Sequence, residues 1–218
     1  MRLRTAELSV TVKERELLLQ EVHHRVKNNL QVISSLMNMQ MRQVTAPAAR
    51  AALAECKTRV EAIALIHEKL YQSADFARVP FSEYATTLAG NIFHATGASP
   101  TGVTLDVQID DVSLPVDQAI PCGLILNELI TNAVKHAFPG ERSGKIIVEL
   151  RMINSRQMLL AVGDDGVGMT EVAAPRASRA LGMQLVETLA AQLDGQLEII
   201  RGHGTQFRIT FPIAEGPS

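Results

Sequence analysis

The feature that most constrains the fold is a pair of long helical patterns separated by one proline turn. Residues 1–44 read as one helix, and within Glu21–Gln40 an apolar stripe recurs at helical spacing, made of Val22, Val26, Leu30, Ile33 and Met37. Thr45-Ala46-Pro47 predicts a turn, because the residue before a proline is pushed out of the helical region. At 1.5 Å per residue the first helix would be on the order of 60 Å long.

The second helical pattern runs from about Ala48 to Gln72 and carries a heptad-like seam. The seam residues alternate at spacings of three and four and are Leu53, Cys56, Val60, Ile63, His67 and Leu70. Two such helices joined by a short turn predict an antiparallel hairpin. A lone hairpin has little core, so we expect pairing with a second copy into a four-helix bundle, and we expect His67 to be a packed histidine of the seam.

Beyond residue 72 the periodicity changes. Ser73–Pro80 reads as a linker, Asp164–Ala180 as a loop rich in small residues, and Ala214–Ser218 as a frayed tail. The helices are expected at Ser82–Thr96, Asp117–Phe138 and Leu181–Leu193, and the strands at Val103–Ile109, Lys145–Ile153, Gln157–Val162, Gly195–Ile200 and Gln206–Phe211. The fold class predicted is α+β: a helical hairpin domain, 1–76, followed by an α/β sandwich, 80–214, whose single sheet is covered by helices on one face.

Composition excludes several classes of function. The formal net charge is −2, aromatic residues are 4%, and Trp is absent, so nucleic-acid binding is not expected. The sequence has no apolar run of membrane-spanning length and no secretory signal core after Met1, so the cytoplasm is the default location. Cys56 and Cys122 lack metal-ligand spacing and read as buried thiols.

Two adjacent histidines mark the first helix. His24 falls away from the apolar stripe, and an exposed neutral imidazole is a competent nucleophile, although a solvated face with two incidental histidines would look the same. The run His24-Arg25-Val26-Lys27-Asn28 resembles the phosphoacceptor helix of two-component histidine kinases. The resemblance makes His24, not His23, the phosphorylated residue. The common acceptor helix has an acid where this chain has Arg25, so Glu21 or Asn28, one turn away, or water must assist His24.

A second motif lies in the helix predicted at Asp117–Phe138. Glu128 and Asn132 are four residues apart and share a helical face, with Lys135 and His136 one turn further on. Oxygen ligands suit Mg²⁺ and a lysine can neutralise phosphate, although a polar surface face would give a similar pattern. The run NELITNAVKHAF closely resembles the N box of the histidine-kinase ATP-binding domain, in the GHKL ATPase superfamily. That resemblance makes Asn132 a magnesium ligand, places Lys135 and His136 near phosphates, and puts Glu128 where other members carry a catalytic Glu.

Three further motifs follow in order. Asp164-Asp165-Gly166-Val167-Gly168 comes directly after a strand, where a carboxylate could accept the adenine amino hydrogen and glycines would let the backbone approach the base. Ordinary Asp-Gly turns produce similar strings, but the position after the N box makes the run resemble the G1 box, with Asp164 recognising adenine. Ser178–Met183 resembles a reduced G2 box that keeps Gly182, at a helix start that could bind phosphate. Gly204-Thr205-Gln206-Phe207 resembles the final GTxF strand, which places Thr205 beside Asp164.

The resemblance covers about residues 15 to 213 and implies a protein histidine kinase. Such an enzyme uses ATP and Mg²⁺, phosphorylates His24, and passes the phosphoryl group to an aspartate of a response-regulator receiver domain, usually as a homodimer. The segment before Gly182 lacks the Phe-rich box of the larger kinases, and the absence of Trp sets the chain beside the HWE subgroup. Two alternatives stay open: a phosphotransferase relay with a degenerate ATP domain, and a GHKL ATPase that uses Glu128 to activate water.

Overall fold

The computed structural model of the protein describes residues 2–72, 78–95, 102–140, 142–169 and 181–213, with only the backbone course for 2–17, 20, 71 and 72. The chain divides into two compact units, Met1–Pro80 and Phe81–Ser218. Most of the expected linker, most of the expected loop and the expected tail lie outside the described residues. No helix in the described part is long and apolar enough to span a bilayer.

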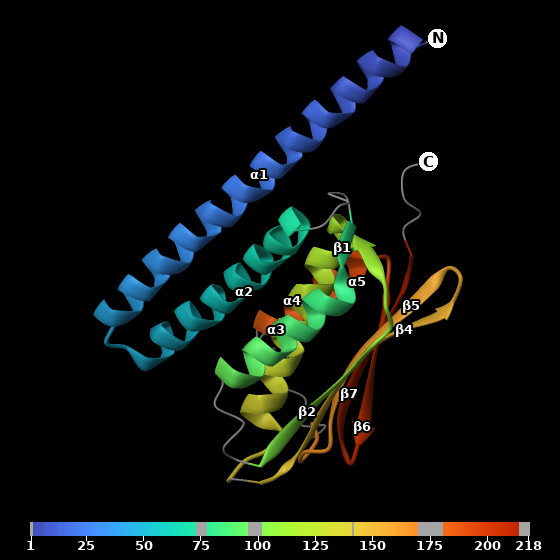
Figure 1. Ribbon diagram of the computed structural model, residues 1–218. Helices are drawn as coiled ribbons and strands as arrows, with labels where there is room; N and C mark the ends of the chain where they lie inside the picture. The colour runs from blue at the N-terminus through green and yellow to red at the C-terminus, as the bar shows by residue number, and fades with distance from the viewer. Residues whose placement is uncertain (1, 73–77, 96–101, 141, 170–180, 214–218) are drawn as a thin grey trace. The chain divides into compact units, whose positions relative to one another are not determined.

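The first unit is the predicted antiparallel hairpin. Helix α1 covers Arg2–Gln43 and helix α2 covers Pro47–Gln72 (Figure 1). Pro47 opens α2, where its missing N–H costs no helical hydrogen bond and its fixed φ suits the first turn. The prediction of a stop at Thr45-Ala46-Pro47 is therefore confirmed. A short strand, β1, occupies Arg78–Pro80, at the end of the stretch that was expected to be linker.

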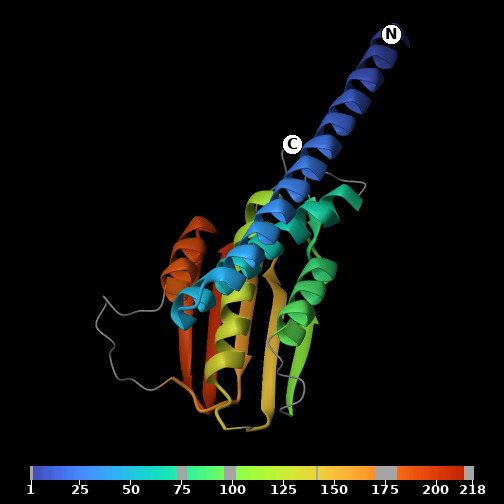
Figure 2. The same cartoon turned by 90° about the vertical axis from the view of Figure 1, so that its left-hand side faces the viewer.

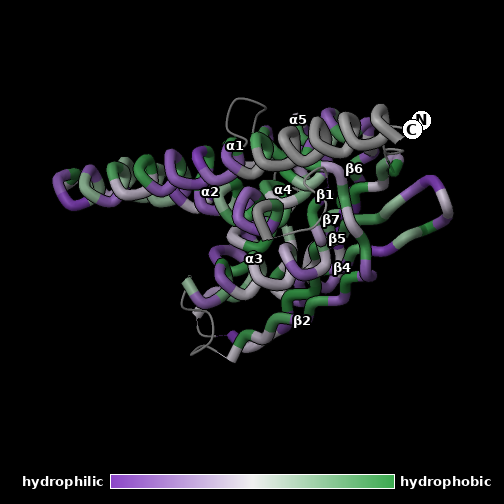
Figure 3. Tube along the Cα trace, turned by 45° about the horizontal axis from the view of Figure 1, so that its top comes forward, coloured by the Kyte–Doolittle hydropathy of each residue, from purple (hydrophilic) through white to green (hydrophobic). Residues whose placement is uncertain are grey.

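The face that α1 turns toward α2 differs from the predicted apolar stripe. Val22 is 52% exposed and Ile33 is 41% exposed, whereas His23 is only 9% exposed. Val26, Leu30 and Met37 are half-buried. In the single hairpin the stripe therefore does not face α2 as a whole, because the buried polar residues His23 and Ser34 occupy part of the helix–helix contact and Val22 and Ile33 lie outside it. Figure 3 shows the resulting mixture of hydrophobic and hydrophilic residues along α1.

Polar pairs connect the two helices, and we call them together the polar seam. His23 Nδ1 lies 3.0 Å from His67 Nδ1, Lys27 Nζ lies 3.1 Å from Glu68 Oε2, and the Ser34 hydroxyl donates to Glu61 Oε1 at 3.1 Å. The expectation that His67 is a packed residue of the hairpin contact is confirmed. Because hydrogen bonds are directional, such pairs define the rotation of α1 against α2 more narrowly than apolar contacts do.

The second unit is built on one mixed five-stranded sheet with the order β2-β4-β5-β7-β6. The strands are β2 (Val103–Ile109), β4 (Gly144–Asn154), β5 (Gln157–Asp164), β6 (Gln196–Gly202) and β7 (Gly204–Pro212), with a separate short strand β3 (Ser113–Pro115). β2 pairs with β4 in parallel, and the other pairs of the sheet are antiparallel. The strands expected at Lys145–Ile153 and Gln157–Val162 are confirmed as the antiparallel pair β4 and β5, and the short strands β1 and β3 were not predicted.

Three helices cover one face of this sheet: α3 (Phe81–Ala95), α4 (Val116–His136) and α5 (Leu181–Gln192) (Figures 1 and 2). Alternate strand residues such as Val148, Leu160 and Ile209 are fully buried, as expected for side chains that face the helices. Leu126 and Ile130 of α4 are equally buried. The predicted α/β sandwich with helices on one face is thus confirmed.

Candidate functional site

Asp164, the last residue of β5, is paired in register with Thr205 near the start of β7. Its Oδ1 atom accepts hydrogen bonds from the backbone N–H of Gly166 at 2.9 Å and of Thr205 at 3.4 Å. Burial raises the pKa of Asp164, while these two hydrogen bonds oppose the increase. Among the described residues none donates a hydrogen bond to Oδ2, so that oxygen is left to accept one from a bound molecule.

The segment that follows Asp164 folds back onto the end of α4 and onto β7. The Val167 N–H donates to the Ala137 carbonyl at 2.9 Å, and the Met169 N–H donates to Thr205 Oγ1 at 3.0 Å. A Cβ atom at Gly166 would collide with the Ala137 backbone, so only glycine fits there. The segment is therefore a fixed structure in which the backbone approaches α4 closely.

Gly204 belongs to the same structure, although its place in the GTxF motif predicted no separate role for it. Its φ is 97°, which favours glycine, and a Cβ atom would collide with the Asp164 carbonyl. Gly204 thus allows β7 to approach the end of β5 closely enough for Thr205 to reach Asp164 and Met169. A glycine directly before the motif threonine was the available signal.

Asp165 has a different role from its neighbour. Its Oδ1 accepts from the Lys145 backbone N–H at 2.7 Å, and its backbone carbonyl accepts from Arg142 at 3.1 Å. Asp165 therefore fixes the start of β4. Of the two adjacent acids, only Asp164 is bonded to Gly166 and Thr205.

Glu128, Asn132 and Gly182 form a second group, where α4 meets the start of α5. A Cβ atom built on Gly182 would lie 2.6 Å from Glu128 Oε2 and 4.0 Å from Asn132 Nδ2. Glu128 is buried, and its Oε1 accepts a hydrogen bond from Asn127 Nδ2 at 3.2 Å. Close packing against Gly182 therefore brings polar side chains of α4 to the N-terminal turn of α5.

Helix α4 links the two groups. Lys135 and His136 are exposed in its last turn, immediately before Ala137, which accepts the hydrogen bond from Val167. Asp164 and Thr205 are on the same side of the sheet as the buried residues Val162 and Phe207, because alternate residues of a strand share a face. One helix-covered side of the unit thus carries Glu128, Asn132, Gly182, Asp164, Gly166 and Thr205.

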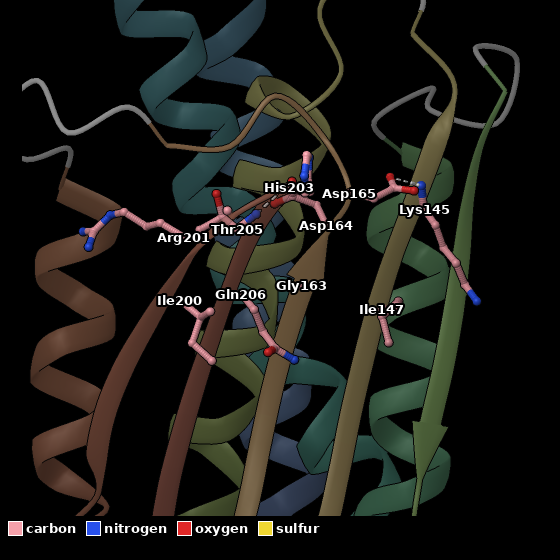
Figure 4. Close-up of a pocket in the computed structure, with 12 residues that line it drawn as sticks. Lys145, Ile147, Gly163, Asp164, Asp165, Ile200, Arg201, His203, Thr205 and Gln206 are labelled. Atoms are coloured by element: carbon pink, nitrogen blue, oxygen red, sulfur yellow. Dashed lines mark hydrogen bonds between the residues drawn. The ribbon is translucent and has the colours of Figure 1, made fainter.

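A cavity of about 380 Å³ lies over the opposite, open face of the sheet (Figure 4). Its floor is one row across four strands, made of Ile147, Gly163, Gln206 and Ile200. It reaches Asp164 and Thr205 only at the strand ends, so it is separate from the polar residues of α4.

In the hairpin unit, His24 is exposed, as predicted, while its neighbour His23 is buried. Glu21 accepts a hydrogen bond from Arg25 Nε at 2.6 Å, and Asn28 is exposed. Glu21 is therefore engaged in an ion pair with the residue that directly follows His24.

Two family models match parts of the chain. A family described as "Histidine kinase" matches residues 21–96, and one described as "Histidine kinase-, DNA gyrase B-, and HSP90-like ATPase" matches residues 117–215. The chain belongs to the histidine kinases.

Relatives of this histidine kinase include sensor proteins. It is 32% identical over 199 residues to the sensor histidine kinase PdtaS of Mycobacterium tuberculosis, covering 89% of this chain and 39% of that protein. It is also 32% identical to the blue-light-activated histidine kinase 2 of Erythrobacter litoralis, over 90% of this chain and 57% of the relative. The kinase thus spans about two fifths to somewhat more than half of these relatives.

A solved structure shares the fold. The histidine kinase domain of the Erythrobacter litoralis EL346 blue-light activated histidine kinase superposes with a TM-score of 0.70 at 28% identity, covering 92% of this chain and 94% of that domain.

Proposed function

We propose that this histidine kinase binds ATP with Mg²⁺ on the helix-covered side of its second unit and transfers the γ-phosphoryl group to His24. The observation that carries the proposal is the pair of groups joined by α4: Asp164 with Thr205 at the strand ends, and Glu128 with Asn132 against Gly182. Both groups fit a nucleotide. The first offers a hydrogen-bond acceptor for the base where the backbone can approach it closely, and the second offers oxygen ligands for Mg²⁺ beside a helix N-terminus that can bind phosphate.

Each predicted residue then has a distinct part. Asp164 Oδ2 accepts the adenine amino hydrogen, while Gly166 and Gly168 keep side chains away from the base. Asn132 supplies an oxygen to Mg²⁺, which when bound neutralises charge that develops on the phosphates. Lys135 and His136 add donors near the phosphates, and Gly182 lies in the first turn of α5, whose backbone N–H groups face them. Thr205 holds Met169 and, with Asp164, fixes the adenine end.

The reaction at His24 is a substitution at phosphorus. A ring-nitrogen lone pair of His24 forms the new N–P bond, the bond between the γ-phosphorus and the bridging oxygen breaks, and ADP leaves with that electron pair. The phosphoryl group then moves to an aspartate of a response-regulator receiver domain. Positioning and charge neutralisation supply most of the rate enhancement in such transfers.

Orientation of His24 involves the residues one turn away. Glu21 sits in an ion pair with Arg25, so its carboxylate is available to His24 only when that exposed pair opens. Asn28, one turn after His24, is the alternative orienting group. We retain both as assisting residues.

We further propose that the kinase is a cytoplasmic homodimer organised as a hairpin domain, 1–76, and an ATP-binding domain, 80–214. A row of large apolar residues on α1 is exposed in the single chain and includes Leu18, Leu19, Val22, Val32, Ile33, Leu36 and Met39. Burial of these residues against a second hairpin would form a four-helix bundle.

One alternative function keeps support from a specific observation. Glu128 is buried, and its Oε2 faces the start of α5, so a general base for water attack on ATP could act from the same position. A relay phosphotransferase with a degenerate ATP domain is less well supported, since the glycine-dependent close contacts around Asp164 are intact.

The test is incubation with γ-labelled ATP and Mg²⁺. Label that is acid-labile and base-stable should appear in the wild type and in His94→Gln, an exposed histidine of α3, and should be lost in His24→Gln. Asn132→Ala should also lose labelling, whereas Asn91→Ala, on the exposed face of α3, should keep it. Labelling that persists in His24→Gln would overturn the acceptor assignment, and ATP hydrolysis without labelling would favour the ATPase.

A further inference from the structure

The residue directly before His24 is held across the hairpin by a second histidine. His23 Nδ1 and His67 Nδ1 are 3.0 Å apart, a hydrogen-bond distance, with ring centroids 5.3 Å apart and planes tilted by 40°. His23 is buried, whereas His24, about 100° further round the helix, is exposed. The direction of His24 is therefore tied to the contact that His23 makes.

Within a single hairpin, several large apolar side chains of α1 near the acceptor do not contribute to fixing its rotation against α2. Leu18, Leu19 and Val22, in the turns before and beside the acceptor, are all exposed. A second cross-helix link near His24 is the ion pair of Lys27 with Glu68, whose side chains are both partly open to solvent. The histidine pair, with His23 buried, is thus better shielded from solvent than this ion pair, and its geometry is directional.

We propose that His67 is a positioning residue for phosphoryl transfer, acting through His23 to set the direction in which His24 projects, and that a second proton on this histidine pair releases α1. The proposal rests on His24 being the phosphoacceptor. It adds a residue of α2 to the transfer machinery and makes the hairpin sensitive to acid.

The proton count explains the release. In the neutral pair one Nδ1 carries a proton and donates to the other, which accepts. A first added proton can sit on the Nε2 of the donor ring, which strengthens the bond. A second added proton must occupy the accepting Nδ1, so the hydrogen bond is lost and two positive rings face each other.

Burial supports this behaviour. Burial, and then the charge of His23, lower the pKa of His67 below its ordinary value of 6.5. The folded hairpin therefore binds fewer protons than the unfolded chain, so the contribution of the pair is complete above pH 6.5 and is lost as the pH falls through the lowered pKa.

The charged groups of the surrounding elements are largely paired with one another. They are Glu21, Arg25 and Lys27 on α1, Glu68 and Lys69 on α2, and Arg78 on β1, the strand that contacts α2. Glu21 is bonded to Arg25 and Lys27 to Glu68, so these four contribute little net field at the rings. The titration of the histidine pair is therefore governed mainly by burial and by the two rings themselves.

The experiment measures the initial rate of His24 labelling in the intact chain from about pH 5 to about pH 8, the range in which histidine titrates. His67→Gln keeps a group that can bond to His23 but cannot take up a proton. It should retain the neutral-pH rate within about threefold, because a bond from the glutamine amide would replace most of what the His67 ring contributes. Its decline in acid should be shallower than that of the wild type, because the site can no longer take up the second proton that opens the histidine pair. His94→Gln, the matched control, should follow the wild-type profile.

His67→Leu should lower the neutral-pH rate by roughly tenfold to a hundredfold through misplacement of the acceptor, with unchanged affinity for an ATP analogue. NMR titration of the imidazole signals, which needs no activity, should show His23 and His67 titrating as a coupled pair, with the second step below pH 6.5.

An acid decline in His67→Gln as steep as in the wild type, a wild-type rate in His67→Leu, or independent titration of the two rings would each overturn the proposal. Absence of His24 labelling in the wild type would instead refute the proposed function, and the NMR result would still decide whether the coupled pair exists.

Discussion

The two units of this histidine kinase handle apolar side chains in opposite ways. In the second unit, Leu126 of α4 and Ile209 of β7 are fully buried within the unit's own sandwich. In the hairpin, Leu36 is 50% exposed while His23 and Ser34 are buried between the helices. The difference teaches that the second unit carries its stability internally, whereas the hairpin buries polar contacts between its helices and leaves large apolar side chains exposed.

The largest expected effect would sharpen this contrast through a matched pair of truncations. Leu126→Ala should destabilise the second unit by about 2–5 kcal/mol, because it opens a cavity in a closed core. Leu36→Ala should change the unfolding free energy of the hairpin by less than about 0.5 kcal/mol at concentrations where the chain is monomeric. Denaturant unfolding of both variants measures this, and equal losses would break the comparison.

A chemical test of the second unit comes next, with Asp164→Asn. The single oxygen of asparagine should take the Oδ1 position to keep the bonds from Gly166 and Thr205, so the amide nitrogen replaces Oδ2. A donor would then face the adenine amino group, and ATP affinity should fall by about 1–3 kcal/mol. Calorimetry with ATP and ITP analogues measures the outcome. The variant should prefer ITP, whose base has a carbonyl where adenine has the amino group. An unchanged preference for ATP would contradict the assignment of Asp164.

A smaller effect is expected on the exposed face of α1. Leu36→Ala should weaken the proposed dimer by about 1 kcal/mol or more, since truncation of a central apolar contact commonly costs that much in an interface. Sedimentation over a dilution series measures the dissociation constant. Asn38→Ala serves as the control, because Asn38 is also exposed on α1 but does not belong to the apolar row. Equal dimer affinities for the two variants would show that this apolar row is not the interface.

The smallest effect is expected in the polar seam. Lys27→Gln removes the ion pair with Glu68 and should cost no more than about 1 kcal/mol, because both side chains are partly solvated. Thermal unfolding at low and high salt measures it, and the difference from the wild type should shrink as salt screens the pair. A loss as large as that of Leu126→Ala would mean that the hairpin depends on its polar contacts for stability as well as for geometry.

Periodicity was sufficient to predict the long elements and the single-sided sandwich. It could not reveal which face of α1 meets α2, because Val22 and Ile33 satisfy a helical period whether they face α2, solvent or the second chain of the proposed dimer. The strands β1 and β3 escaped prediction because three residues next to a proline carry no usable period. Tertiary pairing alone defines them.

The candidate site divides in a similar way. The order of the motifs along the chain was enough to predict Asp164, Gly166, Asn132 and Thr205 as site residues. Each of these positions requires one particular residue type, including glycine where no side chain fits. The sequence could not show that Gly182 packs against Glu128, nor that Gly204 must be glycine to pass the Asp164 carbonyl, because both depend on how separate elements approach each other. The roles in catalysis remain predictions for the experiments above.

The position of β7 within the sheet has a consequence for biosynthesis. β7 is the last described strand, yet it lies between β5 and β6, and β6 pairs with β7 alone among the described strands. During translation the hairpin contacts can form once residue 72 is available, but β6 emerges before its only partner. The nascent chain therefore holds an unpaired strand edge until Pro212 leaves the ribosome. A premature stop before Gly204 would leave both β5 and β6 with open edges, and such edges pair readily with other chains. Chains that end between β6 and β7 should therefore aggregate and be degraded. They should not accumulate as soluble proteins with a folded hairpin and an inactive second unit.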